Sequence, residues 1–139
     1  MTIAAANNFV VMMGDIGNTY LNTNTEEKIY TRVGAKFELV GIMDEGNFLE
    51  VINSLYGLPN GRNRWHAHLS YALRKISFKL TRFDLYVWIA GRKSGYDYIG
   101  THSDDVLLIV VDPTSIFNRI KENYMMKYFG APKVHLGCD

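Results

Sequence analysis

Two adjacent carboxylates, Asp104 and Asp105, lie between two runs of residues that have the composition of strands. The runs are residues 95–100, which are rich in Gly and Tyr, and residues 106–111, which are apolar throughout. A polar segment this short can join two strands only as an antiparallel hairpin. The sequence therefore predicts that both acids lie at the tip of a hairpin, where the backbone is held in place and the side chains reach solvent.

A third carboxylate, Asp15, follows another apolar run at residues 9–14. An Asp-Asp pair alone is a common turn composition and is more often solvated than catalytic. Strand ends from distant parts of the chain can, however, meet at one place, and carboxylate oxygens are the ligands that Mg²⁺ prefers. We therefore expect Asp15, Asp104 and Asp105 to form a site for two Mg²⁺ ions.

The spacing of apolar residues predicts two helices. Between residues 63 and 78 the apolar positions recur every three or four residues, as on one face of a helix: Trp65, Leu69, Ala72, Leu73 and Ile76. Asp112 is a suitable N-cap with Pro113 at the first helical position, and a second apolar stripe continues to about residue 127. Trp65 opens the first stripe, so we expect it in the core.

Several runs have the composition of strands, and turn-like segments at residues 44–46 and 91–95 separate some of them. The expected strands are residues 8–14, 36–43, 47–53, 85–90, 96–101 and 106–111. Two helices on one face of an antiparallel sheet predict an α+β fold. The same pattern fits many domains with a ferredoxin-like core.

The string SLYGLPNGRNRW at residues 54–65 resembles the signature of the reverse transcriptases of copia-type retrotransposons. Other segments resemble further motifs of that family, in the family's order along the chain: residues 15–22, 26–30, 78–84, 102–108, 126–130 and 135–137. The resemblance extends from about residue 4 to the end of the chain.

This resemblance implies a polymerase palm with RNA-directed DNA polymerase activity. Its substrates would be an RNA template, a DNA primer and dNTPs. Asp15 and Asp104 would bridge two Mg²⁺ ions, and Asp105 would support the site. In two-metal nucleotidyl transfer one ion activates the primer 3′-hydroxyl and the other stabilises the leaving pyrophosphate.

The resemblance also implies residues that contact the nucleotide. Tyr20 matches the aromatic residue under the sugar of the incoming nucleotide, although from the sequence alone packing in the core is an equal alternative. Asn60 and Gly61 belong to the loop that contacts the base or the template. Arg62 and Arg64 are positioned to contact phosphate.

Basic residues are concentrated in one part of a chain whose net charge is only +1. Residues 1–60 hold three Lys or Arg against seven Asp or Glu, whereas residues 61–139 hold twelve against seven. The stretch from 61 to 82 has no acid and contains Arg62, Arg64, Arg74, Lys75, Lys79 and Arg82. Such a stretch suits a nucleic-acid backbone, and a solvated helix face is the alternative.

Three residues depart from the family's motifs. His102 stands where a tyrosine usually opens the acidic box, and Ser103 replaces a small aliphatic residue. Asn60 replaces a glutamine and is one methylene shorter. These departures leave a second hypothesis open, namely a catalytically inactive descendant that binds nucleic acid or packs into a larger complex.

The length of 139 residues suits a single domain. We expect residues 1–139 to form one palm-like domain in which fingers and thumb are largely absent. Palm surface that those parts normally cover would then bind a protein partner or a second copy of the chain.

A single cysteine, Cys138, excludes an internal disulfide and suggests an intracellular compartment, cytoplasmic or nuclear. Residues 1–14 fit neither a signal peptide nor a membrane anchor.

Overall fold

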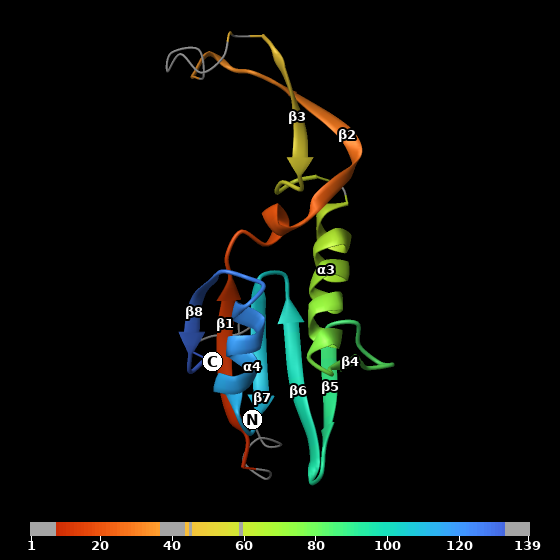
Figure 1. Ribbon diagram of the computed structural model, residues 1–139, viewed down its shortest axis with the longest axis vertical. Helices are drawn as coiled ribbons and strands as arrows, with labels where there is room; N and C mark the ends of the chain where they lie inside the picture. The colour runs from red at the N-terminus through yellow and green to blue at the C-terminus, as the bar shows by residue number, and fades with distance from the viewer. Residues whose placement is uncertain (1–7, 37–43, 45, 59, 133–139) are drawn as a thin grey trace.

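The computed structural model describes residues 8–36, 44, 46–58 and 60–132 and has an α+β fold (Figure 1). Six antiparallel strands form the main sheet in the order β4-β5-β6-β7-β1-β8. Their bounds are β1 Val10–Ile16, β4 Lys79–Leu80, β5 Val87–Arg92, β6 Gly95–His102, β7 Asp105–Val110 and β8 Met126–Gly130. The predicted strands at residues 8–14, 85–90, 96–101 and 106–111 are confirmed to within two residues at each end.

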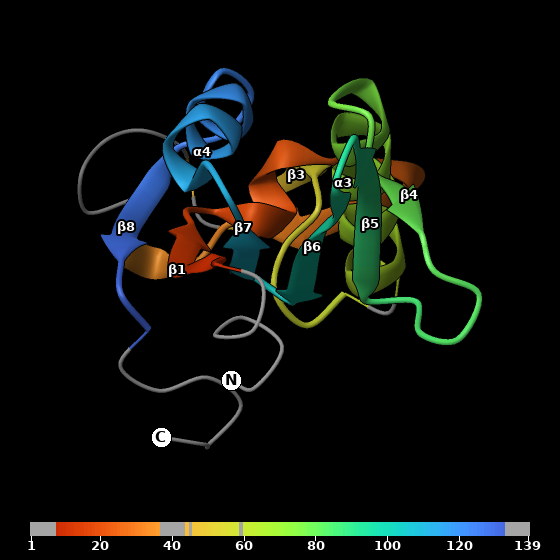
Figure 2. The same cartoon turned by 90° about the horizontal axis from the view of Figure 1, so that it is seen from below.

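Two helices cover one face of this sheet, as predicted (Figure 2). They are α3 Gly61–Lys75 and α4 Pro113–Lys121. Side chains alternate along β7, where Val106, Leu108 and Val110 are buried against the helices and the residues between them are half-buried on the other face. The predicted apolar stripe of α3 joins this core through Trp65, Leu69 and Leu73.

Helix α4 begins as predicted but ends early. The Asp112 side chain accepts a hydrogen bond from the Ser115 amide at 3.1 Å, and Pro113 occupies the first turn. The helix ends at Lys121, so its predicted extension to about residue 127 is wrong. Residues from Met126 form β8 beside β1, where the Gly17 amide donates to the Met125 carbonyl at 2.7 Å.

A separate two-stranded sheet, here called the ribbon, consists of β2 Asn24–Arg32 and β3 Phe48–Asn53. It projects beyond the end of the main sheet (Figure 1). The prediction for residues 47–53 is confirmed, whereas residues 37–43 of the other expected strand lie outside the described residues. Strand β2, which pairs with β3, was not predicted, and neither was the short β4.

The 3-10 helix η1 Thr19–Asn22 links β1 to the ribbon. In the part of the chain that the structure describes, no helix is long and apolar enough to cross a membrane.

Candidate catalytic site

The three acids come from two neighbouring strands of the main sheet. Asp15 lies inside β1 and pairs with Asp105, the first residue of β7. Asp104 lies in the β6–β7 turn, and its carbonyl accepts a hydrogen bond from the Ile16 amide at 2.8 Å. The backbone therefore brings the three predicted ligands together at one end of the sheet.

The hairpin tip has the geometry that the sequence predicts. His102 pairs with Asp105, so Ser103 and Asp104 form a two-residue turn. Ser103 has a φ of 54°, a left-handed conformation that tight hairpin turns require. Serine, like any residue with a Cβ, adopts this backbone conformation only with strain.

His102, Asp105 and Asp15 form a row across β6, β7 and β1. Residues directly opposite each other in antiparallel strands project on the same face. Their chain neighbours Thr101, Val106 and Ile16 are buried under the helices. The row therefore lies on the sheet face that the helices leave uncovered.

The charge of Asp15 is balanced by Lys127 of β8. The Lys127 Nζ lies 3.6 Å from Asp15 Oδ1, and the two side chains are 49% and 34% exposed. This Oδ1 is itself buried and accepts no hydrogen bond from any described residue. Within the described ranges, no three His, Cys, Asp or Glu side chains are grouped as a metal site.

Trp65 connects the hairpin tip to α3. It is 2% exposed, which confirms its expected place in the core. Its indole Nε1 donates to the Ser103 carbonyl at 2.6 Å. The sequence predicted the burial of Trp65 but carried no signal for this bond, because it joins residues that are 38 positions apart.

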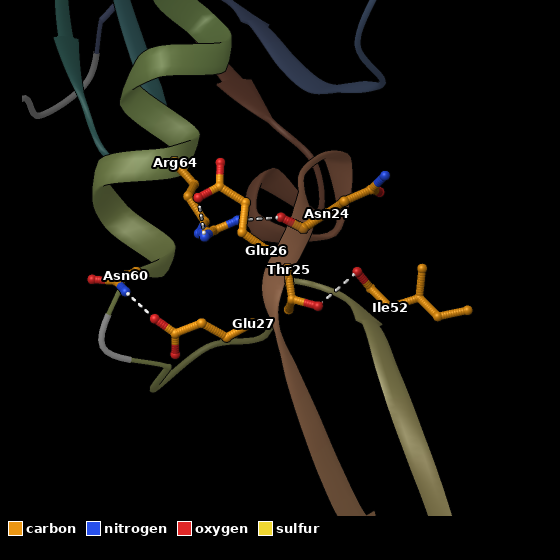
Figure 3. Close-up of polar contacts among 7 residues, drawn as sticks. All are labelled: Asn24, Thr25, Glu26, Glu27, Ile52, Asn60 and Arg64. Atoms are coloured by element: carbon orange, nitrogen blue, oxygen red, sulfur yellow. Dashed lines mark hydrogen bonds and ion pairs between the residues drawn. The ribbon is translucent and has the colours of Figure 1, made fainter.

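The residues expected to contact a nucleotide gather at the start of α3. The Tyr20 ring packs edge-on against Tyr56 with 4.5 Å between centroids, and a Cβ at Gly61 would lie 3.2 Å from Tyr20 Cδ1. Tyr20 is half-buried against the core, so core packing accounts for part of its role. The Asn60 Nδ2 donates to Glu27 Oε1 of β2 at 3.4 Å (Figure 3).

The expected phosphate-binding residues fall into different environments. The Arg64 guanidinium forms an ion pair with Glu26 at 3.0 Å and donates to the Asn24 carbonyl at 2.8 Å (Figure 3). Arg62 is exposed on the first turn of α3, and no side-chain partner for it is found among the described residues. Arg74 and Lys75 lie at the other end of the helix, about 20 Å away at 1.5 Å per residue.

The junction between the ribbon and α3 contains a partly open cavity of about 20 Å³, which is enough for one water molecule. Thr25, Glu26, Ser54, Asn60 and Arg64 are among the residues that line it. Ser54 is 1% exposed, and its Oγ has no hydrogen-bond partner in the described structure. The sequence reasoning missed Glu26 and Ser54, although both belong to segments that resemble the family's motifs.

The two histidines of α3 have separate partners. The His66 Nε2 lies 2.8 Å from the Leu85 carbonyl, whereas the His68 Nδ1 lies 2.9 Å from the Tyr124 hydroxyl. Burial raises the pKa of Tyr124 to about 12, because the charged phenolate loses its hydration. Tyr124 and His68 therefore form part of the packing between α4 and α3.

Two sequence comparisons bear on this arrangement. A family model described as "Reverse transcriptase (RNA-dependent DNA polymerase)" matches residues 1–139. No curated protein matches the chain. The matched range includes all three acids, the hairpin tip and the start of α3.

Proposed function

The chain belongs to the reverse transcriptase (RNA-dependent DNA polymerase) family, and on that premise we propose that it is the palm region of a copia-type retrotransposon enzyme. Residues 1–139 act as a single palm-like domain that adds deoxynucleotides to a DNA primer on an RNA template. The observation that carries this proposal is the cross-strand pairing of Asp15 with Asp105 beside the Asp104 turn.

One feature of the acids favours a divalent cation, namely the buried Asp15 oxygen, and another, the nearby Lys127, competes with it. Asp15 Oδ1 is buried and accepts no hydrogen bond from the described residues, so its lone pairs are available to a cation. The Lys127 ammonium, 3.6 Å away, already supplies positive charge to this oxygen. In the proposed active form Asp15 and Asp104 would hold Mg²⁺ as ligands, and Asp105 would support them.

The protein's own residues hold the reacting groups in position. Mg²⁺ held there would activate the primer hydroxyl and stabilise the charge of the leaving pyrophosphate. The bond from the Trp65 indole to the Ser103 carbonyl and the bond from the Ile16 amide to the Asp104 carbonyl fix the hairpin tip. Tyr20, Asn60 and Gly61 place the nucleotide, and Arg62, Arg64, Arg74 and Lys75 contact the nucleic acid.

A second candidate function is a non-catalytic descendant that binds nucleic acid or a protein partner. The ion pair between Lys127 and Asp15 favours it, because a protein cation already compensates the first acid. The residues His102, Ser103 and Asn60 favour it as well, since each departs from the family's motif. In this reading the same sheet face serves as a binding surface.

Primer extension on an RNA template with dNTPs and Mg²⁺ separates the two functions. The wild-type chain is compared with Asp104→Asn and with Asp44→Asn, which makes the same change at an exposed residue outside the site. Catalysis predicts extension by the wild-type and Asp44→Asn proteins and its loss, by a factor of about 10² or more, in Asp104→Asn.

The assay is repeated at several salt concentrations, because contacts to phosphates weaken as salt rises. No extension by folded wild-type protein at any salt concentration would overturn the catalytic proposal and leave the non-catalytic one.

A further inference from the structure

A second and larger cavity lies on the helix-covered side of the hairpin tip. Its volume is about 140 Å³, and it opens between the first half of α3 and the end of β6. Arg62, Trp65, His66, Tyr86, Thr101 and His102 contribute to its walls. None of the three acids lines the cavity, although His102 and Ser103 of the hairpin tip border it.

The walls of this cavity are held by hydrogen bonds. The Trp65 indole donates to the Ser103 carbonyl at 2.6 Å, and His66 Nε2 lies 2.8 Å from the Leu85 carbonyl. The Thr101 amide donates to the Tyr86 carbonyl at 2.8 Å. These bonds join three elements: helix α3, the loop that precedes β5, and the end of β6. The cavity is therefore largely preformed, as ligand sites usually are.

The size and lining of the cavity suit one aromatic ring. A cavity of about 150 Å³ holds a ring the size of benzene. Trp65, His66, Tyr86 and His102 bring aromatic rings to the walls. The rings of His66 and Tyr86 lie edge to face with 5.5 Å between centroids. Because a carbonyl can only accept, His66 Nε2 carries the proton in its bond to Leu85, and in the neutral ring Nδ1 remains an acceptor.

The charge at the cavity suits an anion beside that ring. Arg62 is exposed and has no side-chain partner among the described residues, in contrast to Arg64 two positions later. A cation in the first turn of a helix is unfavourable unless an anion compensates it. None of the described residues that line the cavity is acidic.

We propose that this cavity binds one pyrimidine nucleotide of a single nucleic-acid strand, with the base against the partly exposed rings of His66 and Tyr86 and the phosphate on Arg62. This inference rests on the proposed nucleic-acid function and adds a binding site that none of the three acids lines. The base supplies stacking area, and the guanidinium supplies a charged hydrogen bond to phosphate.

NMR titration with uridine 5′-monophosphate tests the proposal in the presence of EDTA, so that binding does not depend on a metal or on catalysis. The chain has two tryptophans, of which Trp65 lines the cavity and Trp88 does not. We expect the Trp65 indole signal to shift in a saturable manner, with a larger change than that of Trp88. A titration with deoxyuridine 5′-monophosphate then tells whether an RNA or a DNA strand is preferred.

Variants and simpler ligands locate the contacts. Arg62→Gln should weaken uridine monophosphate binding about twofold to fivefold, while Arg119→Gln, at an exposed arginine of α4, should leave it unchanged. Uridine should bind the wild-type protein as weakly as the nucleotide binds Arg62→Gln. Inorganic phosphate alone should not shift the Trp65 signal.

The proposal is overturned if the folded wild-type protein shows no saturable shift at Trp65, or if Arg62→Gln and Arg119→Gln bind alike. A shift produced by phosphate as strongly as by the nucleotide would also overturn it. Because none of these measurements needs primer extension, a failure here is distinct from a failure of the proposed catalysis.

Discussion

The main sheet buries its helix-facing side chains, whereas the ribbon leaves most of its side chains in solvent. Trp88, Ile99 and Val110 of the sheet are fully buried. In the ribbon, Phe48 and Ile52 are 72% and 69% exposed. The ribbon depends instead on polar contacts with α3, such as the Arg64–Glu26 ion pair. The sheet therefore holds the acids in place by apolar burial, while the position of the ribbon depends on a few bonds.

The largest expected difference between the two regions is in stability. Trp65→Ala removes a buried indole and its bond to the Ser103 carbonyl, so the free energy of unfolding should fall by about 3 to 5 kcal/mol. Phe48→Ala, in the ribbon, should change it by less than about 0.5 kcal/mol. Urea denaturation of both variants measures this. Equal losses would contradict the contrast between sheet and ribbon.

A smaller effect is expected at the junction. Arg64→Gln removes the ion pair with Glu26 and the bond to the Asn24 carbonyl, at a cost of about 1 to 2 kcal/mol. We expect amide exchange to accelerate about 5- to 30-fold in β2 and β3 and to stay unchanged in β6 and β7. Arg62→Gln is the matched control and should leave the exchange rates of the ribbon amides unchanged. Acceleration throughout the chain would mean that the ribbon is not a separate unit.

The free energy of unfolding should fall at high pH. Burial raises the pKa of Tyr124 from 10.0 to about 12, so the folded state holds this proton where the unfolded state loses it. The contribution of Tyr124 to stability is therefore complete below pH 10 and is lost as the pH rises toward 12. Urea denaturation between pH 9 and 12 measures the decline. In Tyr124→Phe this decline should be smaller, and an identical decline would contradict the assignment to Tyr124.

The smallest expected effect concerns Lys127. Its ion pair with Asp15 is about half exposed, and such pairs contribute about 1 kcal/mol or less. Lys127→Gln should therefore tighten Mn²⁺ binding at the acids by a factor of about 2 to 5, measured by calorimetry. Lys121→Gln, on α4, should have no effect. Weaker metal binding in Lys127→Gln would mean that the lysine supports the cation instead of competing with it.

The sequence predicted the sheet better than the ribbon, for a physical reason. Alternating burial in β7 and the Asp112-Pro113 cap of α4 leave clear local patterns. Strand β2 contains Glu26, Glu27 and Lys28 and exposes most of both faces, so no alternation marks it as a strand. The early end of α4 was missed because neither Gly nor Pro follows Lys121 before β8.

The sequence predicted the positions of the three acids in the candidate site, but not the contacts that distant residues make with them. The hairpin motif predicts the positions of Asp104 and Asp105, and the run before Asp15 predicts a strand that reaches them. The pairing of Lys127 with Asp15 and the bond from Trp65 to Ser103 depend on strand order and helix placement. No local pattern in the sequence encodes such long-range contacts.

The central claim, that Asp15, Asp104 and Asp105 bind a divalent cation, is tested most directly by Mn²⁺ binding followed by NMR. We expect saturable paramagnetic broadening of amides at the hairpin tip and the end of β1, with none in the ribbon. This broadening should disappear in Asp104→Asn and persist in Asp44→Asn. Broadening that is absent at the tip of the folded wild-type protein, or that survives in Asp104→Asn, would contradict the claim.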